Sequence, residues 1–136
     1  MRHAQKLAEE NPEYWYPFQY GNADNPKAHY EGTGPEIWRD APEVTHFVAG
    51  LGTSGTFVGT GRRLRQFNPA IKLISFQPDS PFHGLEGLKH MASSIVPGIY
   101  HEEELDEKLP IGTEDAYDMV YKLGTDEGIV VGQSSG

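Results

Sequence analysis

The sequence predicts an α/β fold built on a parallel, Rossmann-like sheet with flanking helices. Residues 44–50 (VTHFVAG) are rich in β-branched residues and lead into a glycine-rich loop. Apolar and small residues follow at helical spacing (Val58, Gly61 and Leu64), and residues 71–76 (IKLISF) form a second apolar segment. Strand, helix and strand in this order make a right-handed βαβ unit, so we expect two buried parallel strands joined by a helix that starts near Gly55.

The first 35 residues predict a helix, a strand and a long loop. Residues 4–10 have apolar positions on one side of a helix, and residues 14–20 (YWYPFQY) are aromatic, which favours an extended strand broken by a proline. Residues 21–34 are rich in Gly, Asn, Asp and Pro and predict a loop. Pro35 then suits the first position of a helix, where Glu36 would favour the positive end of the helix dipole.

The second half predicts a loop, a helix and a short buried strand. Residues 78–98 read as a loop, and residues 113–123 as a helix with Thr113 as its N-cap and an apolar face formed by Ala116, Met119, Val120 and Leu123. Residues 128–132 (GIVVG) predict the strand. Because helical patterns are cut at both ends, we expect residues 1–136 to form a single partial domain truncated at both termini.

Charge and composition narrow the possible functions. The net charge of −9 disfavours nucleic acid and anionic membranes as partners, and the acidic run at residues 101–107 (HEEELDE) is typical of a solvated face. The chain has no cysteine, and its six histidines lack the spacing of metal ligands, so we expect no metal site. Neither a membrane helix nor a signal peptide is recognisable, which favours a cytoplasmic protein.

The glycine loop, residues 50–56 (GLGTSGT), allows three interpretations. It fits the dinucleotide fingerprint G-x-G-x-x-G, but the acidic residue expected after the next strand is replaced by Asp79 behind a proline. It also suits a single phosphate, bound by backbone N–H groups and hydroxyls at a helix N-terminus. The residues of that site would be Gly52, Thr53, Ser54, Gly55 and Thr56. The third interpretation is a tight turn without a ligand.

Three motifs in order resemble the cysteine synthase and cystathionine β-synthase family of fold-type II pyridoxal-phosphate enzymes, most closely its cysteine synthase B branch. They are the glycine loop, similar to the family's G-T-G-G-T phosphate cup, residues 18–38 (FQYGNADNPKAHYEGTGPEIW) and residues 127–136 (EGIVVGQSSG). Ser54 stands where many relatives have glycine, and the first proline of the family's N-P-x-N is absent at Ala23-Asp24. The resemblance implies that the chain is part of the larger domain of such an enzyme.

The resemblance assigns roles to individual residues. Gly52 to Thr56 would hold the phosphate of pyridoxal 5′-phosphate, and the Ser134 hydroxyl would contact the pyridine nitrogen, which suits β-elimination. Gln19 would face the substrate carboxylate. Lys89 and His90 lie in the segment that covers the active site, where a cation would favour O-phosphoserine over O-acetylserine. Purely structural roles remain open as alternatives. Ser134 would then be a helix N-cap, Gln19 an ordinary polar residue, and Lys89 and His90 solvated residues. His29 and His46 read as structural.

The resemblance also implies what the intact protein does. Such an enzyme makes L-cysteine from an activated serine (O-acetylserine or O-phosphoserine) and sulfide or another sulfur donor, and is a homodimer. The family's Schiff-base lysine lies in a motif that none of the chain's lysines matches, so we expect no catalytic lysine here and an inactive isolated chain. An NAD(P)-binding domain of an oxidoreductase and a non-catalytic phosphate-binding module are the alternatives.

Overall fold

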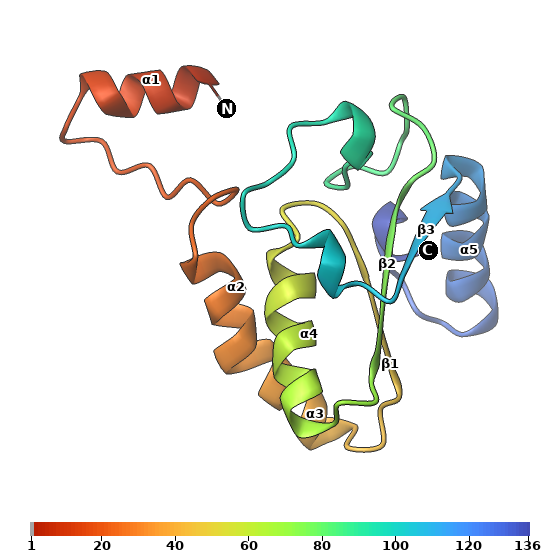
Figure 1. Ribbon diagram of the computed structural model, residues 1–136. Helices are drawn as coiled ribbons and strands as arrows, with labels where there is room; N and C mark the ends of the chain where they lie inside the picture. Colours follow the sequence, from red (N-terminus) through yellow and green to blue (C-terminus); the bar gives the residue numbers. More distant parts are fainter. Residues whose placement is uncertain (1) are drawn as a thin grey trace.

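Three parallel strands form the centre of the computed structural model, which describes residues 2–136 (Figure 1). The sheet order is β1 (His46–Gly50), β2 (Lys72–Pro78) and β3 (Glu107–Ile111). In its register Val48 pairs with Ile74, and Phe76 pairs with Leu109. Helix α4 (Gly55–Phe67) connects β1 to β2, so the predicted α/β class and the βαβ unit are confirmed.

Helix α4 covers one face of the sheet and supplies much of the core. Its predicted inner residues are buried, and Phe57 packs against Phe47 of β1 with ring centroids 6.0 Å apart. Burying one such aromatic side chain stabilises the fold by about 1.5–3 kcal/mol. The core is completed by residues from α4 and from the segments before and after it, namely Leu51, Val58, Leu64, Ile71, Leu73 and Met91.

The segment predicted as a long loop, residues 21–34, is mostly helical, and that prediction was wrong. It contains α2 (Asp24–Ala28) and a π-helical turn (His29–Thr33), followed by α3 (Gly34–Asp40) with the expected proline in its first turn. The Asn22 side chain accepts a hydrogen bond from the Asp24 N–H at 2.9 Å, at the start of α2. Composition indicated a loop because the residues that cap a helix are the same as those that make turns.

Glycines on α4 allow α2 to pack closely. A Cβ on Gly59 would lie 2.0 Å from the Pro26 carbonyl oxygen, and one on Gly55 would lie 1.8 Å from Asn25 Oδ1. Both distances are shorter than any real contact, so only glycine permits this packing. The tertiary contact, rather than local propensity, therefore holds residues 24–33 in their helical conformation.

Helix α5 (Thr113–Asp126) lies on the opposite face of the sheet from α4 and leaves β1 partly uncovered (Figure 1). It starts at the predicted residue, but its N-cap is Gly112 and not Thr113. Only Ala116 of its predicted apolar face is buried. Val48 of β1 is 53% exposed. The prediction that the first strand is buried was therefore wrong. This strand is an edge strand, and α5 packs over the β3 side.

Two predicted strands are absent and one strand was missed. Within residues 2–136 neither 14–20 nor 128–132 pairs with another strand, and Val130 is 93% exposed. Both segments have strand-like composition, but no neighbouring strand offers them backbone partners. The missed strand, β3, has charged and proline residues that hid its pattern, although an edge strand tolerates proline.

The N-terminal helix was expected, and its position in Figure 1 is peripheral. It is α1 (Arg2–Glu10), which agrees with the helix predicted for residues 4–10 and lies apart from the sheet and its covering helices. No helix in residues 2–136 is both long and apolar enough to span a membrane.

The packing of α2 on α4 leads to a stability prediction. We expect Gly59→Ala to lower the free energy of unfolding by about 1–3 kcal/mol, because the added methyl group collides with the Pro26 carbonyl. The matched control is Gly124→Ala in α5, where a Cβ would meet nothing within 4 Å; it should be neutral or stabilising by up to about 1 kcal/mol. Urea unfolding measures both, and equal effects would contradict the proposed contact.

Candidate functional site

The glycine loop joins the end of β1 to the start of α4 and is fixed by backbone contacts. The Leu51 N–H donates to the Phe76 carbonyl at 2.9 Å, and the Leu51 carbonyl accepts from the Lys89 N–H at 2.8 Å. Ser54 adopts the left-handed conformation with φ 69° and is only 3% exposed. A non-glycine residue in this conformation is uncommon, so the turn into α4 is constrained by its surroundings.

Several backbone donors of the loop have no partner. Within the described part of the chain no hydrogen bond is made by four N–H groups of the loop, those of Gly52, Thr53, Ser54 and Thr56. The N–H group of Phe57, the next residue in α4, has no partner either. The Gly55 N–H has only a long contact of 3.4 Å to Thr53 Oγ1. Free donors at the start of a 13-residue helix create a positive local potential, which suits an anion. The donor set therefore fits a phosphate group.

The glycines of the loop also have packing roles that the sequence interpretation missed. A Cβ on Gly52 would lie 2.5 Å from the Gly87 carbonyl oxygen, and Gly55 lies against the Asn25 side chain. Close packing thus explains part of the glycine content that was attributed to a ligand. The unpartnered N–H groups are the stronger argument for anion binding, because packing does not satisfy them.

Asn25 links the glycine loop to the segment that carries Gln19. Its Nδ2 donates to the Gln19 carbonyl at 2.8 Å and to Thr53 Oγ1 at 3.2 Å. The neighbouring Tyr20 carbonyl accepts from the Gly98 N–H at 2.8 Å. The side chain of Gln19 is exposed at this junction. Asn25 was not singled out from the sequence, although it belongs to the N-P-K-A-H stretch of the resembling motif.

The covering loop, residues 83–91, brings Lys89 to the segment that carries Gln19 and Tyr20. The Lys89 ammonium lies 5.0 Å from the centroid of the Tyr20 ring. His90 turns to its own segment, where Nδ1 contacts Ser93 Oγ at 2.8 Å. The structure thus gathers Gln19, Thr53 and Lys89, while His90 makes a local contact.

Thr56 and His29 form a chain of hydrogen bonds behind the loop. His29 Nε2 contacts Thr56 Oγ1 at 3.1 Å, and His29 Nδ1 contacts Thr33 Oγ1 at 2.9 Å. The expectation that His29 is tied into the local hydrogen bonds is therefore confirmed. His46 is the first residue of β1, as expected of a strand residue.

Ser134 lies on the face of the sheet that α5 covers, opposite to α4. It sits in a short 3-10 turn (Gln133–Ser135) and lines a cavity of about 250 Å³ with Val48, Phe76 and Ile111. Leu85 of the covering loop lines the same cavity, so the covering loop borders both regions. Among residues 2–136, no hydrogen bond or ion pair joins Ser134 to the glycine loop. The role of Ser134 toward a pyridine ring therefore stays a prediction.

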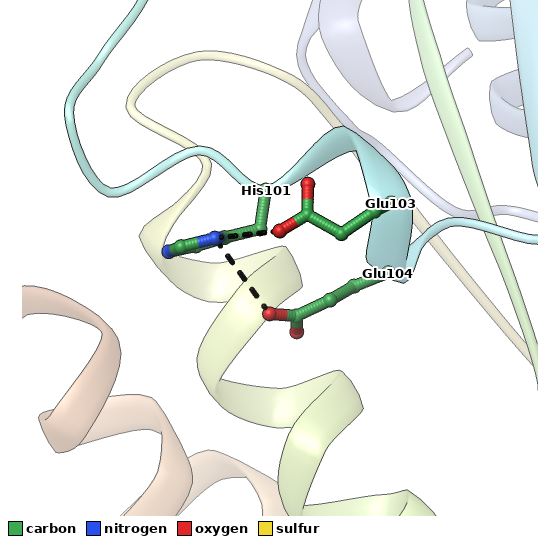
Figure 2. A group of neighbouring side chains, drawn as sticks. All are labelled: His101, Glu103 and Glu104. Atoms are coloured by element: carbon green, nitrogen blue, oxygen red, sulfur yellow. Dashed lines mark hydrogen bonds and ion pairs between the residues drawn. The ribbon is translucent and has the colours of Figure 1, made fainter.

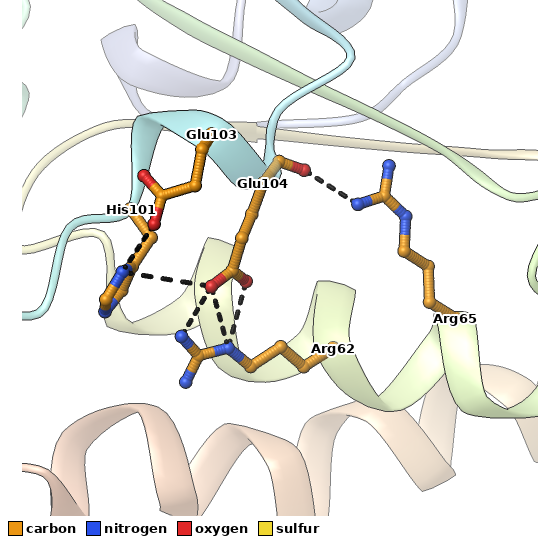
Figure 3. A network of polar contacts seen from close by, with 5 residues as sticks. All are labelled: Arg62, Arg65, His101, Glu103 and Glu104. Atoms are coloured by element: carbon orange, nitrogen blue, oxygen red, sulfur yellow. Dashed lines mark hydrogen bonds and ion pairs between the residues drawn. The ribbon is translucent and has the colours of Figure 1, made fainter.

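One group of potential metal ligands was not expected from the sequence. The ligand atoms of His101, Glu103 and Glu104 all lie within 4.8 Å of one another (Figure 2). However, Arg62 of α4 donates to both Glu104 oxygens, with Nε 2.9 Å from Oε2, and Arg65 donates to the Glu104 carbonyl at 2.8 Å (Figure 3). Glu104 raises the pKa of Arg62 through this hydrogen bond. The group therefore acts as a partly exposed charge network that ties α4 to the segment before β3.

Asp106 is the second anchor of that network. Its Oδ2 accepts from the Leu73 N–H at 2.7 Å and from Arg65 at 2.6 Å, and Lys72 lies 3.6 Å from Oδ1. The Leu73 N–H is the main reason that the pKa of Asp106 lies below its usual value, with Arg65 and Lys72 adding to the effect. The acidic run read as a solvated face is thus partly engaged in structural contacts.

Comparison with known proteins identifies the family. The model of the pyridoxal-phosphate dependent enzyme family matches residues 1–136. The chain belongs to this family. It is 53% identical over 133 residues to a cysteine synthase of Aquifex aeolicus, covering 96% of this chain and 41% of that one. It is 38% identical over 119 residues to cysteine synthase B of Pseudomonas aeruginosa, covering 87% of this chain and 40% of that one.

The solved structures agree with this family. The crystal structure of cysteine synthase (OASS) from Entamoeba histolytica matches with a TM-score of 0.89 at 35% identity, covering 98% of this chain and 42% of that one. The chain therefore spans about two fifths of the length of the relatives it matches. The family cofactor is pyridoxal phosphate, whose phosphate suits the unpartnered donors at the start of α4. The family's cofactor therefore favours the single-phosphate interpretation of the loop over the dinucleotide interpretation.

The Asp106 network gives a pH-dependent prediction. Because the pKa of Asp106 is lowered in the folded protein, its carboxylate stabilises the fold above the ordinary pKa of about 3.9, and this contribution disappears as the pH falls through the lowered value. We expect Asp106→Asn to lower the free energy of unfolding at pH 7 and to have a smaller effect at pH 2.5, as measured by urea unfolding.

The control for this experiment is Asp118→Asn, since Asp118 is an exposed residue of α5 outside the network. It should change stability little at either pH. An equal loss for Asp106→Asn at both pH values would mean that the charge of the carboxylate does not matter.

Proposed function

We propose that the protein containing this chain catalyses the pyridoxal-phosphate-dependent formation of L-cysteine from an activated serine and a sulfur donor. The activated serine is O-acetylserine or O-phosphoserine, and the sulfur donor is sulfide or another sulfur compound. The observation that carries the proposal is the set of five unpartnered N–H groups in the glycine loop and at Phe57 of α4, close to the segments of Gln19 and Lys89. The cysteine synthase names of the relatives support the same activity.

In this proposal each group of residues has a physical task. The free N–H groups of the glycine loop and the Thr53 hydroxyl hold the cofactor phosphate, and the α4 dipole adds favourable potential. The Gln19 amide donates to the substrate carboxylate. The covering loop excludes water, and its Lys89, held over the Tyr20 ring, pairs with the leaving group. His90 has the same task in this proposal only if it leaves its contact with Ser93. When bound, pyridoxal phosphate supplies an electron sink for negative charge at the substrate α-carbon.

Ser134 completes the proposed cofactor site from the opposite side. A neutral hydroxyl donating to the pyridine nitrogen leaves the ring without a full positive charge, and this favours elimination at the β-carbon over transamination. Its position in the cavity bordered by Leu85 places it near the covering loop, which supports the assignment. Homodimer formation by the intact protein remains a prediction from the resemblance.

Activity of the full polypeptide is the first test of this proposal. We expect the protein that contains residues 1–136, supplied with pyridoxal phosphate, to form cysteine from sulfide and at least one of the two activated serines, as measured by ninhydrin detection. Tight binding of NAD(H) in place of pyridoxal phosphate would refute the proposal. Cofactor binding without turnover of either serine would instead indicate a non-catalytic module.

The role of the glycine loop is tested by Thr53→Val in the same protein. We expect its affinity for pyridoxal phosphate to fall about 10-fold or more, because a hydrogen bond to a charged group contributes about 1.5–3 kcal/mol. Thr125→Val is the matched control, as Thr125 is exposed near the end of α5. Fluorescence titration of the apo-protein measures both affinities. An unchanged affinity for Thr53→Val would remove its hydroxyl from the site.

We also propose that residues 1–136 alone form no cysteine. No lysine of this sequence matches the motif of the family's catalytic lysine, and without that amine the α-proton of the substrate has no base to accept it. The same ninhydrin assay, run with the isolated chain and with the full polypeptide at equal concentration, tests this. Cysteine formation by the isolated chain would show that one of its own lysines supplies the amine.

A further inference from the structure

Lys89 is held in an unusual way for a lysine of this chain. Lys6, Lys72 and Lys108 each pair with a carboxylate, whereas Lys27, Lys122 and Lys89 do not within residues 2–136. What distinguishes Lys89 from the other lysines is its contact with an aromatic ring. Within residues 2–136 no carboxylate lies within 4 Å of the Lys89 ammonium, and its contact is with the Tyr20 ring, 5.0 Å from the centroid. Both residues are half-buried. The ammonium therefore keeps its capacity to pair with an incoming anion.

The backbone on both sides of this contact is fixed. The covering loop is fastened at Gly84, whose N–H donates to Thr113 Oγ1 at 3.1 Å and whose carbonyl accepts from the Tyr117 hydroxyl at 3.1 Å. At its other end the Lys89 N–H donates to the Leu51 carbonyl. The backbone of Tyr20 is held by the bond from the Gly98 N–H to the Tyr20 carbonyl. The side chains of Tyr20 and Lys89 thus meet between two anchored segments.

We propose that Tyr20 is a positioning residue that holds the Lys89 ammonium above the Gln19 segment, ready to pair with the anionic leaving group of the bound substrate. The attraction between a cation and a half-exposed ring is weaker than a charge-assisted hydrogen bond to a phosphate or carboxylate. A bound anion therefore draws the ammonium from the ring, while the ring limits its positions before binding. The nature of the ligand rests on the proposed function, whereas the contact itself does not.

Two readouts in the full polypeptide with pyridoxal phosphate test this proposal. Tyr20→Leu and Lys89→Met should each speed hydrogen exchange of the amides of residues 84–90 several-fold, and Tyr20→Phe should leave it unchanged because the ring is kept. For O-phosphoserine, Lys89→Met should raise KM about 10-fold and Tyr20→Leu about 3-fold, with kcat changed less than 2-fold. The double variant should be no worse than Lys89→Met alone.

Matched controls come from α5. Tyr121→Leu and Lys122→Met alter the same residue types at exposed positions of that helix, and both should leave KM and exchange unchanged. Equal effects of Tyr20→Phe and Tyr20→Leu, or additive effects in the double variant, would overturn the proposal. If the protein makes no cysteine, the proposed function fails, and the exchange data still decide whether Tyr20 restrains Lys89.

Discussion

The close packing of α2 on α4 is the contact on which the candidate site depends. Gly55 and Gly59 have no side chains, so the Asn25 side chain and the Pro26 carbonyl come into direct contact with α4. From that position Asn25 reaches both the Gln19 carbonyl and the Thr53 hydroxyl. A helix held farther away would leave these two segments unconnected. Gly55 and Gly59 thus allow the proposed substrate-binding segment around Gln19 to lie next to the N-terminal end of α4.

The parts of the fold that the sequence predicted are those with strong local patterns. The segments β1, α4 and β2 combine β-branched strands with a helix of regular apolar spacing, and each lies where it was expected. The segments that failed depend on distant partners. Residues 128–132 have strand composition but no neighbouring strand to pair with among residues 2–136, and residues 24–33 have loop composition but are held in a helix by contacts with α4. Local pattern contains no information about such partners.

The candidate site divides in the same way. The glycine loop was found because its composition is unusual and because it lies between a strand and a helix. Asn25 and Tyr20 were missed because their importance comes from contacts with residues 28 and 69 positions away in the chain, Thr53 and Lys89. The charge network of Arg62 and Glu104 was missed for the same reason, since 42 positions separate these two residues.

Besides the Asn25 side chain, backbone groups join the segments around the glycine loop. The Lys89 N–H binds the Leu51 carbonyl, the Gly98 N–H binds the Tyr20 carbonyl, and the Gly87 carbonyl lies against Gly52. A replaced side chain at Lys89 or Tyr20 keeps the donors and acceptors of these hydrogen bonds, because any residue except proline supplies the same N–H. The architecture therefore separates two requirements. Main-chain contacts fix the geometry of the glycine loop, and the side chains of the covering loop remain free for the role toward the leaving group that we propose for them.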